Sequence, residues 1–168
     1  MYQVNDIIVY GVQGIYQVDS IVEMKLGKTK EAKMYYVLKD MFHQENKIYA
    51  PTDIKTVKMR KIISKNEAEL LIEQISTIKP VSAEDEKSNQ QVYQTLLNSI
   101  APENWISLLK SISRKDTQRK EKGIKQLAQS DHHLKKVTES LLYGELSISL
   151  ASSKEEIEAI MIKKIDTN

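Results

Sequence analysis

Few residues of this chain could carry out chemistry, and none of them forms a recognised catalytic pattern. The histidines are His43 and the neighbours His132 and His133. Adjacent side chains on a helix point about 100° apart, so His132 and His133 do not form the i, i+4 pair that binds a metal. The chain contains no cysteine, which excludes thiolate chemistry and disulfides.

Nucleotide loops and hydrolase motifs are also missing from the sequence. There is no G-x-S-x-G, no phosphate-binding loop and no G-x-G-x-x-G, and the five glycines are scattered. The acidic runs Glu84-Asp85-Glu86 and Glu155-Glu156 fall at the predicted first turns of helices, where negative charge is favourable. We therefore expect no enzyme activity, no cofactor, no metal and no small-molecule substrate.

A basic segment between positions 110 and 125 is the densest concentration of charge. Its cations, opposed only by Asp116 and Glu121, are Lys110, Arg114, Lys115, Arg119, Lys120, Lys122 and Lys125. Most such runs are solvated helix faces. The functional alternative is a patch that contacts phosphates of nucleic acid.

The only tryptophan follows a helical spacing rather than a surface pattern. Trp105 stands at i, i+3, i+4 and i+7 with Leu108, Leu109 and Ile112. This spacing predicts one apolar face of a helix, so we expect Trp105 in a hydrophobic core.

The first sixty residues have the pattern of short strands. Apolar residues alternate from Tyr16 to Leu26, which predicts a half-buried strand with Tyr16, Val18, Val22, Met24 and Leu26 on one face. Shorter strands are predicted at 7–10, 34–38 and 47–50, with turns at Gly11, Gly14 and Gly27, and Pro51 ends the last strand. So many short antiparallel strands predict a small barrel.

Beyond Lys61 the apolar spacing becomes helical. Stripes run over 68–78, after a Ser64 or Asn66 cap, and over 92–100, 105–112, 134–142 and 157–165. Each stripe is narrow, so the helices must pack on one another. The predicted fold class is α+β with two domains, a β-barrel at 1–60 and an all-α helical bundle at 61–168.

Length and composition fit a globular protein. The chain has 168 residues, 40% of them hydrophobic and 29% charged, with a net charge of +2. It shows neither a signal peptide nor an apolar run of about 20 residues. We therefore expect a cytoplasmic protein with no membrane partner.

Several fragments resemble CarD/CdnL proteins, a family of bacterial transcription regulators. The opening Val4–Tyr10 followed by Gly14 resembles the family's V-G-D-x-V-V-Y start, and Tyr36–Lys39 resembles its Y-x-V-L-K strand. Pro51 stands where the family has a proline, and 141–146 (LLYGEL) resembles its L-x-x-G-E-L signature. The resemblance implies an SH3/Tudor-like barrel, similar to the polymerase-interacting domain of the transcription-repair coupling factor.

The resemblance also implies partners and positions. The family's barrel binds the RNA polymerase β subunit, at positions that correspond to Met24 and Tyr49 here. Its helical domain touches promoter DNA beside the open bubble through a wedge tryptophan, replaced here by Asn89 and followed by Gln90 and Gln91. Asn5 replaces a turn glycine, which asparagine's tolerance of positive φ accommodates.

We therefore expect a regulator that binds the polymerase β subunit and modulates the open promoter complex. Any DNA contact is expected to be weak and independent of sequence, because asparagine cannot act as an apolar wedge. The DNA-contact residues predicted by the alignment and the basic segment are Asn89, Gln90, Gln91, Arg114, Lys115, Arg119, Lys120 and Lys122. The first alternative is an interaction module that binds polymerase or another protein without DNA. The second is an enzyme with an unrecognised site, which would require a cleft of residues with perturbed pKa values.

Overall fold

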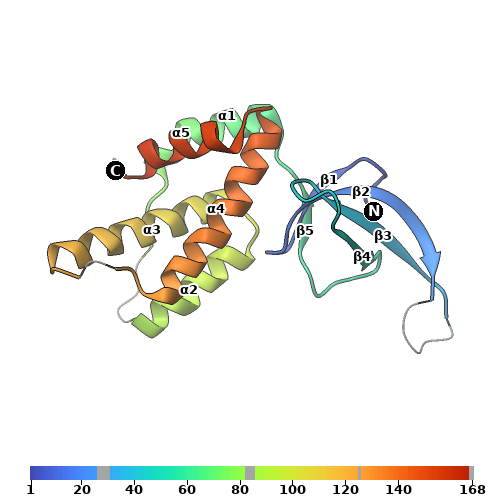
Figure 1. Cartoon of the computed structure of the whole chain (residues 1–168), viewed down its shortest axis with the longest axis horizontal. Coiled ribbons are helices and arrows are strands. Elements are labelled where there is room, and N and C mark those ends of the chain that lie inside the picture. Colours follow the sequence, from blue (N-terminus) through green and yellow to red (C-terminus); the bar gives the residue numbers. More distant parts are fainter. Residues whose placement is uncertain (26–30, 82–85, 125, 167–168) are drawn as a thin grey trace. The chain divides into compact units, whose positions relative to one another are not determined.

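The chain folds into two compact units, 1–62 and 63–168, each described here by itself. A computed structural model describes residues 1–25, 31–81, 86–124 and 126–166. Strands make up the first unit and helices the second (Figure 1). The predicted strand residue Leu26, the turn residue Gly27, the acidic residues Glu84 and Asp85, and Lys125 of the basic segment lie outside the described residues.

The described part of the N-terminal unit contains one sheet of five antiparallel strands. They are β1 (Ile7–Tyr10), β2 (Gly14–Met24), β3 (Lys33–Asp40), β4 (Lys47–Pro51) and β5 (Met59–Lys61), in the order β4-β3-β2-β1-β5. The α+β class is confirmed, but the sheet of the described residues is open rather than closed into a barrel. β5 has three residues and pairs with β1, which leaves β4 and β5 as the two edges.

Buried residues lie on both faces of this sheet: Val9, Ile15, Tyr35 and Val37 on one, and the main hydrophobic cluster on the other. The buried members of this cluster come from four strands and are Ile8, Tyr10, Tyr16, Val18, Tyr36, Leu38 and Ala50. Tyr2 and Val57, from outside the strands, pack against this cluster. The backbone N–H of Tyr2 donates to the Tyr36 hydroxyl at 3.1 Å, and the two rings meet edge to face. Segments outside the strands thus cover part of the hydrophobic cluster, which the strands of a closed barrel would otherwise cover.

A β-bulge interrupts β2 and reverses its faces. Val18 pairs with Leu38 but Ser20 pairs with Val37, so Asp19 is the extra residue. Beyond it Ile21, and not Val22, turns toward the core. The predicted single face from Tyr16 to Met24 is therefore wrong: Val22 and Met24 lie on the opposite face.

Two turn positions adopt the left-handed conformation. Asn5 has φ 74°, as predicted for an asparagine in place of a turn glycine. Gly11 has φ 53°, and a Cβ there would lie 3.0 Å from a Val57 methyl group. Gly11 thus allows the chain between β1 and β2 to pass close to the core.

Among the described residues of the second unit there are five α-helices and one 3-10 helix. They are α1 (Lys65–Gln74), η1 (Ile75–Thr77), α2 (Glu86–Asn98), α3 (Pro102–Glu121), α4 (Gln129–Ser149) and α5 (Lys154–Asp166). α1 begins at Ser64, which forms a capping box with Glu67, so the predicted serine cap is confirmed. The stripe predicted over 68–78 is divided, because α1 ends at Gln74 and η1 carries the buried Ile75.

The predicted apolar stripes form the core of the helical unit. The largest fully buried side chains of its helices are Trp105, Ile75, Ile106, Leu108, Ile112, Leu142, Leu146, Ile157 and Met161. α3 packs against α2, α4 and α5. Ile100, predicted within a helix, lies beyond the end of α2 at φ 53° and is buried at the corner that leads to α3.

The segment 141–146 contributes a buried carboxylate to the start of this unit. Glu145 has no exposed surface, and its Oε1 accepts a hydrogen bond from the Ile63 N–H at 2.9 Å. One turn later, the Ser149 hydroxyl donates to the Ile63 carbonyl at 2.7 Å. α4 therefore holds both backbone groups of the residue with which the helical unit begins.

Candidate functional site: a sheet face and a helical basic segment

Met24 and Tyr49, the predicted polymerase-contact residues, lie on the same face of the sheet. Residues directly opposite one another in an antiparallel pair share a face. Met24 pairs with Lys33 and Val22 with Tyr35, while Val37 pairs with Tyr49. We call the five apolar residues of this surface the second face; they are Val22, Met24, Tyr35, Val37 and Tyr49.

The second face is exposed at Tyr49 and buried between its ends. Tyr49 is 50% exposed, Met24 is half-buried, and Tyr35 and Val37 are buried. β4, which carries Tyr49, is an edge strand. The arrangement presents apolar side chains beside an edge that can pair with another strand. The sequence pattern missed Tyr35 and Val37 as neighbours of Met24, because only the bulge brings these residues to one face.

Lysines flank the second face. Lys33 and Lys47 lie on it by their register, and both are exposed. Lys47 forms an ion pair with Asp19 at 3.2 Å, and Lys33 lies 3.9 Å from Asp53. Exposed ion pairs of this kind contribute little to folding, so the lysines can turn toward a partner at low cost.

In the helical unit, the basic segment forms the second half of α3. Arg114 and Lys122 are exposed, and Arg119 is half-buried with its Nε donating to the Gln126 carbonyl at 3.2 Å. Lys120 is 62% exposed and forms an ion pair with Asp116, one turn earlier, at 2.6 Å. Arg114 and Lys120 thus carry exposed cations on α3 and Lys122 carries one at its C-cap, while Arg119 is partly covered.

Other members of the predicted DNA-contact set point into the helical unit. The Lys115 ammonium forms an ion pair with the buried Asp131 of α4 at 2.6 Å, and the Gln90 amide of α2 donates to the same carboxylate at 2.5 Å. The sequence pattern missed Asp131, because an acid in the first turn of a helix is usually explained by the helix dipole alone.

Lys110, at the start of the basic segment, also faces inward. The residue is 4% exposed, and its ammonium donates to the carbonyls of Ile75, at 2.5 Å, and of Ile78, at 2.8 Å. Burial lowers the pKa of Lys110. Lys110 therefore satisfies the backbone around the end of η1, and its charge is not at the surface.

Asn89 and Gln91 lie in the first half of α2. Asn89 is half-buried and Gln91 is exposed. Trp105 is fully buried, and its indole N–H donates to the Leu97 carbonyl at 3.1 Å. The prediction that Trp105 belongs to the core is confirmed.

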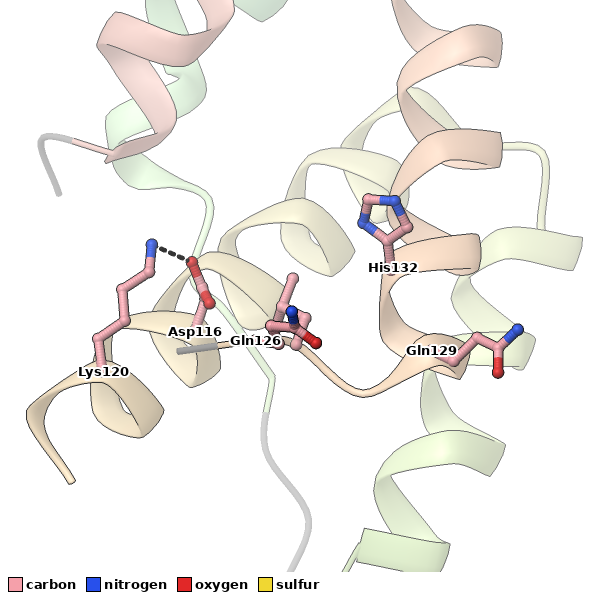
Figure 2. A pocket seen from close by; sticks show the side chains of 6 residues that line it. Asp116, Lys120, Gln126, Gln129 and His132 are labelled. Atoms are coloured by element: carbon pink, nitrogen blue, oxygen red, sulfur yellow. Dashed lines mark ion pairs between the residues drawn. The ribbon is translucent and has the colours of Figure 1, made fainter. Parts of the chain in front are cut away.

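A hollow of about 490 Å³ opens between the end of α3 and the start of α4. Figure 2 shows it with the Asp116–Lys120 ion pair at one side; its lining residues are Asp116, Lys120, Gln126, Leu127, Gln129 and His132. Of the histidines, His132 lines this hollow. His43 lies in the turn between β3 and β4, with its Nδ1 3.6 Å from Oδ1 of Asp40. Across the ranges given above, no three histidine or acidic residues are grouped so that they could hold a metal ion.

The described residues thus form a small antiparallel β unit, whose second face is exposed at Tyr49, and a helical unit with a basic helix end. Residues 2–63 match the family model of the CarD-like/TRCF RID domain, the RNA polymerase-interacting domain (RID) named after CarD and the transcription-repair coupling factor (TRCF). The N-terminal unit of this chain is therefore a CarD-like/TRCF RID domain, which confirms the resemblance over residues 2–63; the match does not extend to the segment 141–146. RID domains of this family are non-enzymatic and bind the β subunit of RNA polymerase.

The match covers the sheet and stops where the helical unit begins. No curated protein matches the chain. None of the helices, as far as the structure describes them, is both long and apolar enough to span a membrane.

Proposed function

We propose that this chain binds the RNA polymerase β subunit through the second face of its RID domain. The observation that carries the proposal is the family match over residues 2–63, together with the position of Met24 and Tyr49 on one face of the sheet. An exposed tyrosine and a half-buried methionine beside buried apolar neighbours are residue types enriched in protein interfaces. Lys33 and Lys47 would form its polar rim.

Paired substitutions test this proposal in the full chain. Met24→Asp and Tyr49→Asp each place a charge on the second face, and each should weaken capture by purified polymerase about tenfold or more, as for interface residues worth more than ~1.4 kcal/mol. Binding of the unaltered chain should depend weakly on salt, since the central contact is apolar.

Met34→Asp is the matched control. Met34 is 44% exposed on β3, but it pairs with Glu23 and so lies on the other face of the sheet. This variant should bind polymerase as the unaltered chain does. If polymerase failed to capture Met34→Asp but fully captured the Met24 and Tyr49 variants, the contact would lie on the opposite face of the sheet and the proposal would be wrong.

For the helical unit, we propose a weak contact with phosphates of promoter DNA near the open bubble. Arg114, Lys120 and Lys122 support it, because their charged groups reach the surface at the end of α3. Phosphate contacts of this type position a protein without reading bases. A protein that binds the open promoter complex better than the closed one shifts the equilibrium between them.

Glutamine at Arg114, Lys120 and Lys122 tests the DNA contact. The logarithm of the DNA-binding constant decreases linearly with the logarithm of the salt concentration, and the magnitude of this slope should decrease by about 0.9 for each phosphate contact that is lost. Glutamine at the exposed Lys55 and Lys58 of the N-terminal unit is the control and should leave the slope unchanged. Equal slopes for the triple variant and the unaltered chain would contradict the contact.

That negative outcome would favour the second candidate, an interaction module that binds polymerase without DNA. Its supporting observations are the small net charge of +2 and the pairing of Lys115 and Lys120 with acidic residues of the same unit. The two candidates share the polymerase contact. They differ only in the response of binding to promoter DNA and salt.

A further inference from the structure

Asp131 joins three helices of the C-terminal unit at one buried point. It is the third residue of α4 and has no exposed surface. Gln90 of α2 donates to Oδ1 at 2.5 Å, and Lys115 of α3 contacts Oδ2 at 2.6 Å. Both partners come from segments that carry proposed DNA-contact residues, so one carboxylate connects the start of α2 with the basic half of α3.

The ion pair between Lys115 and Asp131 differs from its neighbour in exposure and not in length. Lys120 and Asp116 are also 2.6 Å apart, but their side chains are 62% and 24% exposed. The corresponding values are 15% for Lys115 and 0% for Asp131. A DNA phosphate can compete with Asp116 for Lys120 in water. It cannot take Lys115 without leaving a buried carboxylate uncompensated, which is the costly outcome for a buried pair.

We propose that Asp131 is a positioning residue of the DNA-facing surface. It holds the Lys115 ammonium and the Gln90 amide inside the helical unit, so that neither reaches nucleic acid. Asp131 thereby limits the number of phosphate contacts and keeps the affinity for DNA low. This inference rests on the proposed DNA contact and specifies which cations belong to it.

The salt dependence of DNA binding by the full chain tests the inference. Lys115→Gln should leave the slope of log K against log salt concentration unchanged, whereas Lys120→Gln should make it shallower by about 0.9. Asp131→Asn should make the slope steeper by about 0.9, because the released Lys115 adds one phosphate contact. The double variant Asp131→Asn/Lys115→Gln should return to the slope of the unaltered chain. A merely structural role would not produce this pattern.

A second measurement needs no DNA. Acetic anhydride should modify Lys115 several-fold more slowly than Lys120 in the folded chain, as followed by peptide mass spectrometry. Asp131→Asn should abolish the difference. If this variant does not fold, the acetylation of the unaltered chain still decides, because Lys115→Gln also leaves the Asp131 carboxylate buried without its partner. A reduced slope with Lys115→Gln, or equal acetylation of Lys115 and Lys120, would overturn the inference. Protection of Lys115 without any DNA binding would refute the proposed DNA contact and leave the role of Asp131 in holding Lys115 intact.

Discussion

Trp105 shows how a single side chain can be assigned from its spacing. It is fully buried in α3, and the Leu97 carbonyl satisfies its indole N–H. A buried indole with its only donor paired has no group left for DNA. Trp105 is therefore not available as a wedge at DNA, and Asn89 remains the predicted counterpart of the family's wedge tryptophan.

Replacing Trp105 with alanine should destabilise the helical unit by about 3–5 kcal/mol, the usual cost of truncating a large buried aromatic side chain. Thermal unfolding followed by circular dichroism measures this loss, with Trp105→Phe as a milder control. The fluorescence of the unaltered chain should be blue-shifted and should not respond to opened promoter DNA. Red-shifted emission that DNA quenches would instead place Trp105 at the surface.

The direction of individual cations could not be predicted from the sequence. Arg114 and Lys115 are neighbours in the same run of charge, yet Arg114 is exposed and Lys115 meets Asp131. The difference depends on α4, whose contact with α3 is not encoded in the local pattern. Lys110 likewise faces inward because the end of η1 offers it two carbonyl groups.

At the scale of elements, period-two and helical patterns predicted the order of strands and helices. The four longer strands and the capped start of α1 follow from alternation and from Ser64 with Glu67. The three-residue β5 is too short to show alternation. The bulge at Asp19 was visible only as two lapses in the pattern, Ser20 and Ile21, and its effect on the faces requires the pairing with β3.

Helix α4 also explains part of the segment that resembles the L-x-x-G-E-L signature. Glu145 accepts from the Ile63 N–H, and Ser149 donates to the Ile63 carbonyl. The preceding residue, Ile62, donates instead to the Ile7 carbonyl of the N-terminal unit. Two consecutive amides of the chain are thus each bound within their own unit.

Glu145→Leu should destabilise the helical unit by about 1–3 kcal/mol, because the Ile63 N–H loses its acceptor at a buried position. Urea unfolding followed by circular dichroism gives the free energy of unfolding. Glu145→Gln keeps an acceptor oxygen and should lose less stability. If leucine proved as stable as glutamate, the hydrogen bond to Ile63 would have no net role in folding.

At the scale of the whole molecule, the two units have separate cores and separate proposed partners. The sheet unit matches the RID family model, and the helical unit begins where the match ends. The family resemblance, and not composition, pointed to polymerase, because a net charge of +2 selects no partner. In the helical unit, the proposed phosphate contacts are limited to the exposed cations Arg114, Lys120 and Lys122, because Lys115 is paired with the buried Asp131.

The bulge at Asp19 has a consequence for how β2 tolerates mutation. Before it, every second residue, such as Tyr16 and Val18, belongs to the core; after it, the phase is inverted and Ile21 takes that role. A saturation mutagenesis library should therefore show sensitivity to polar residues alternating along β2 and changing phase at Asp19. Selection for folding alone and selection for polymerase binding would then yield complementary profiles beyond the bulge, since Ile21 serves the core while Val22 and Met24 serve the second face.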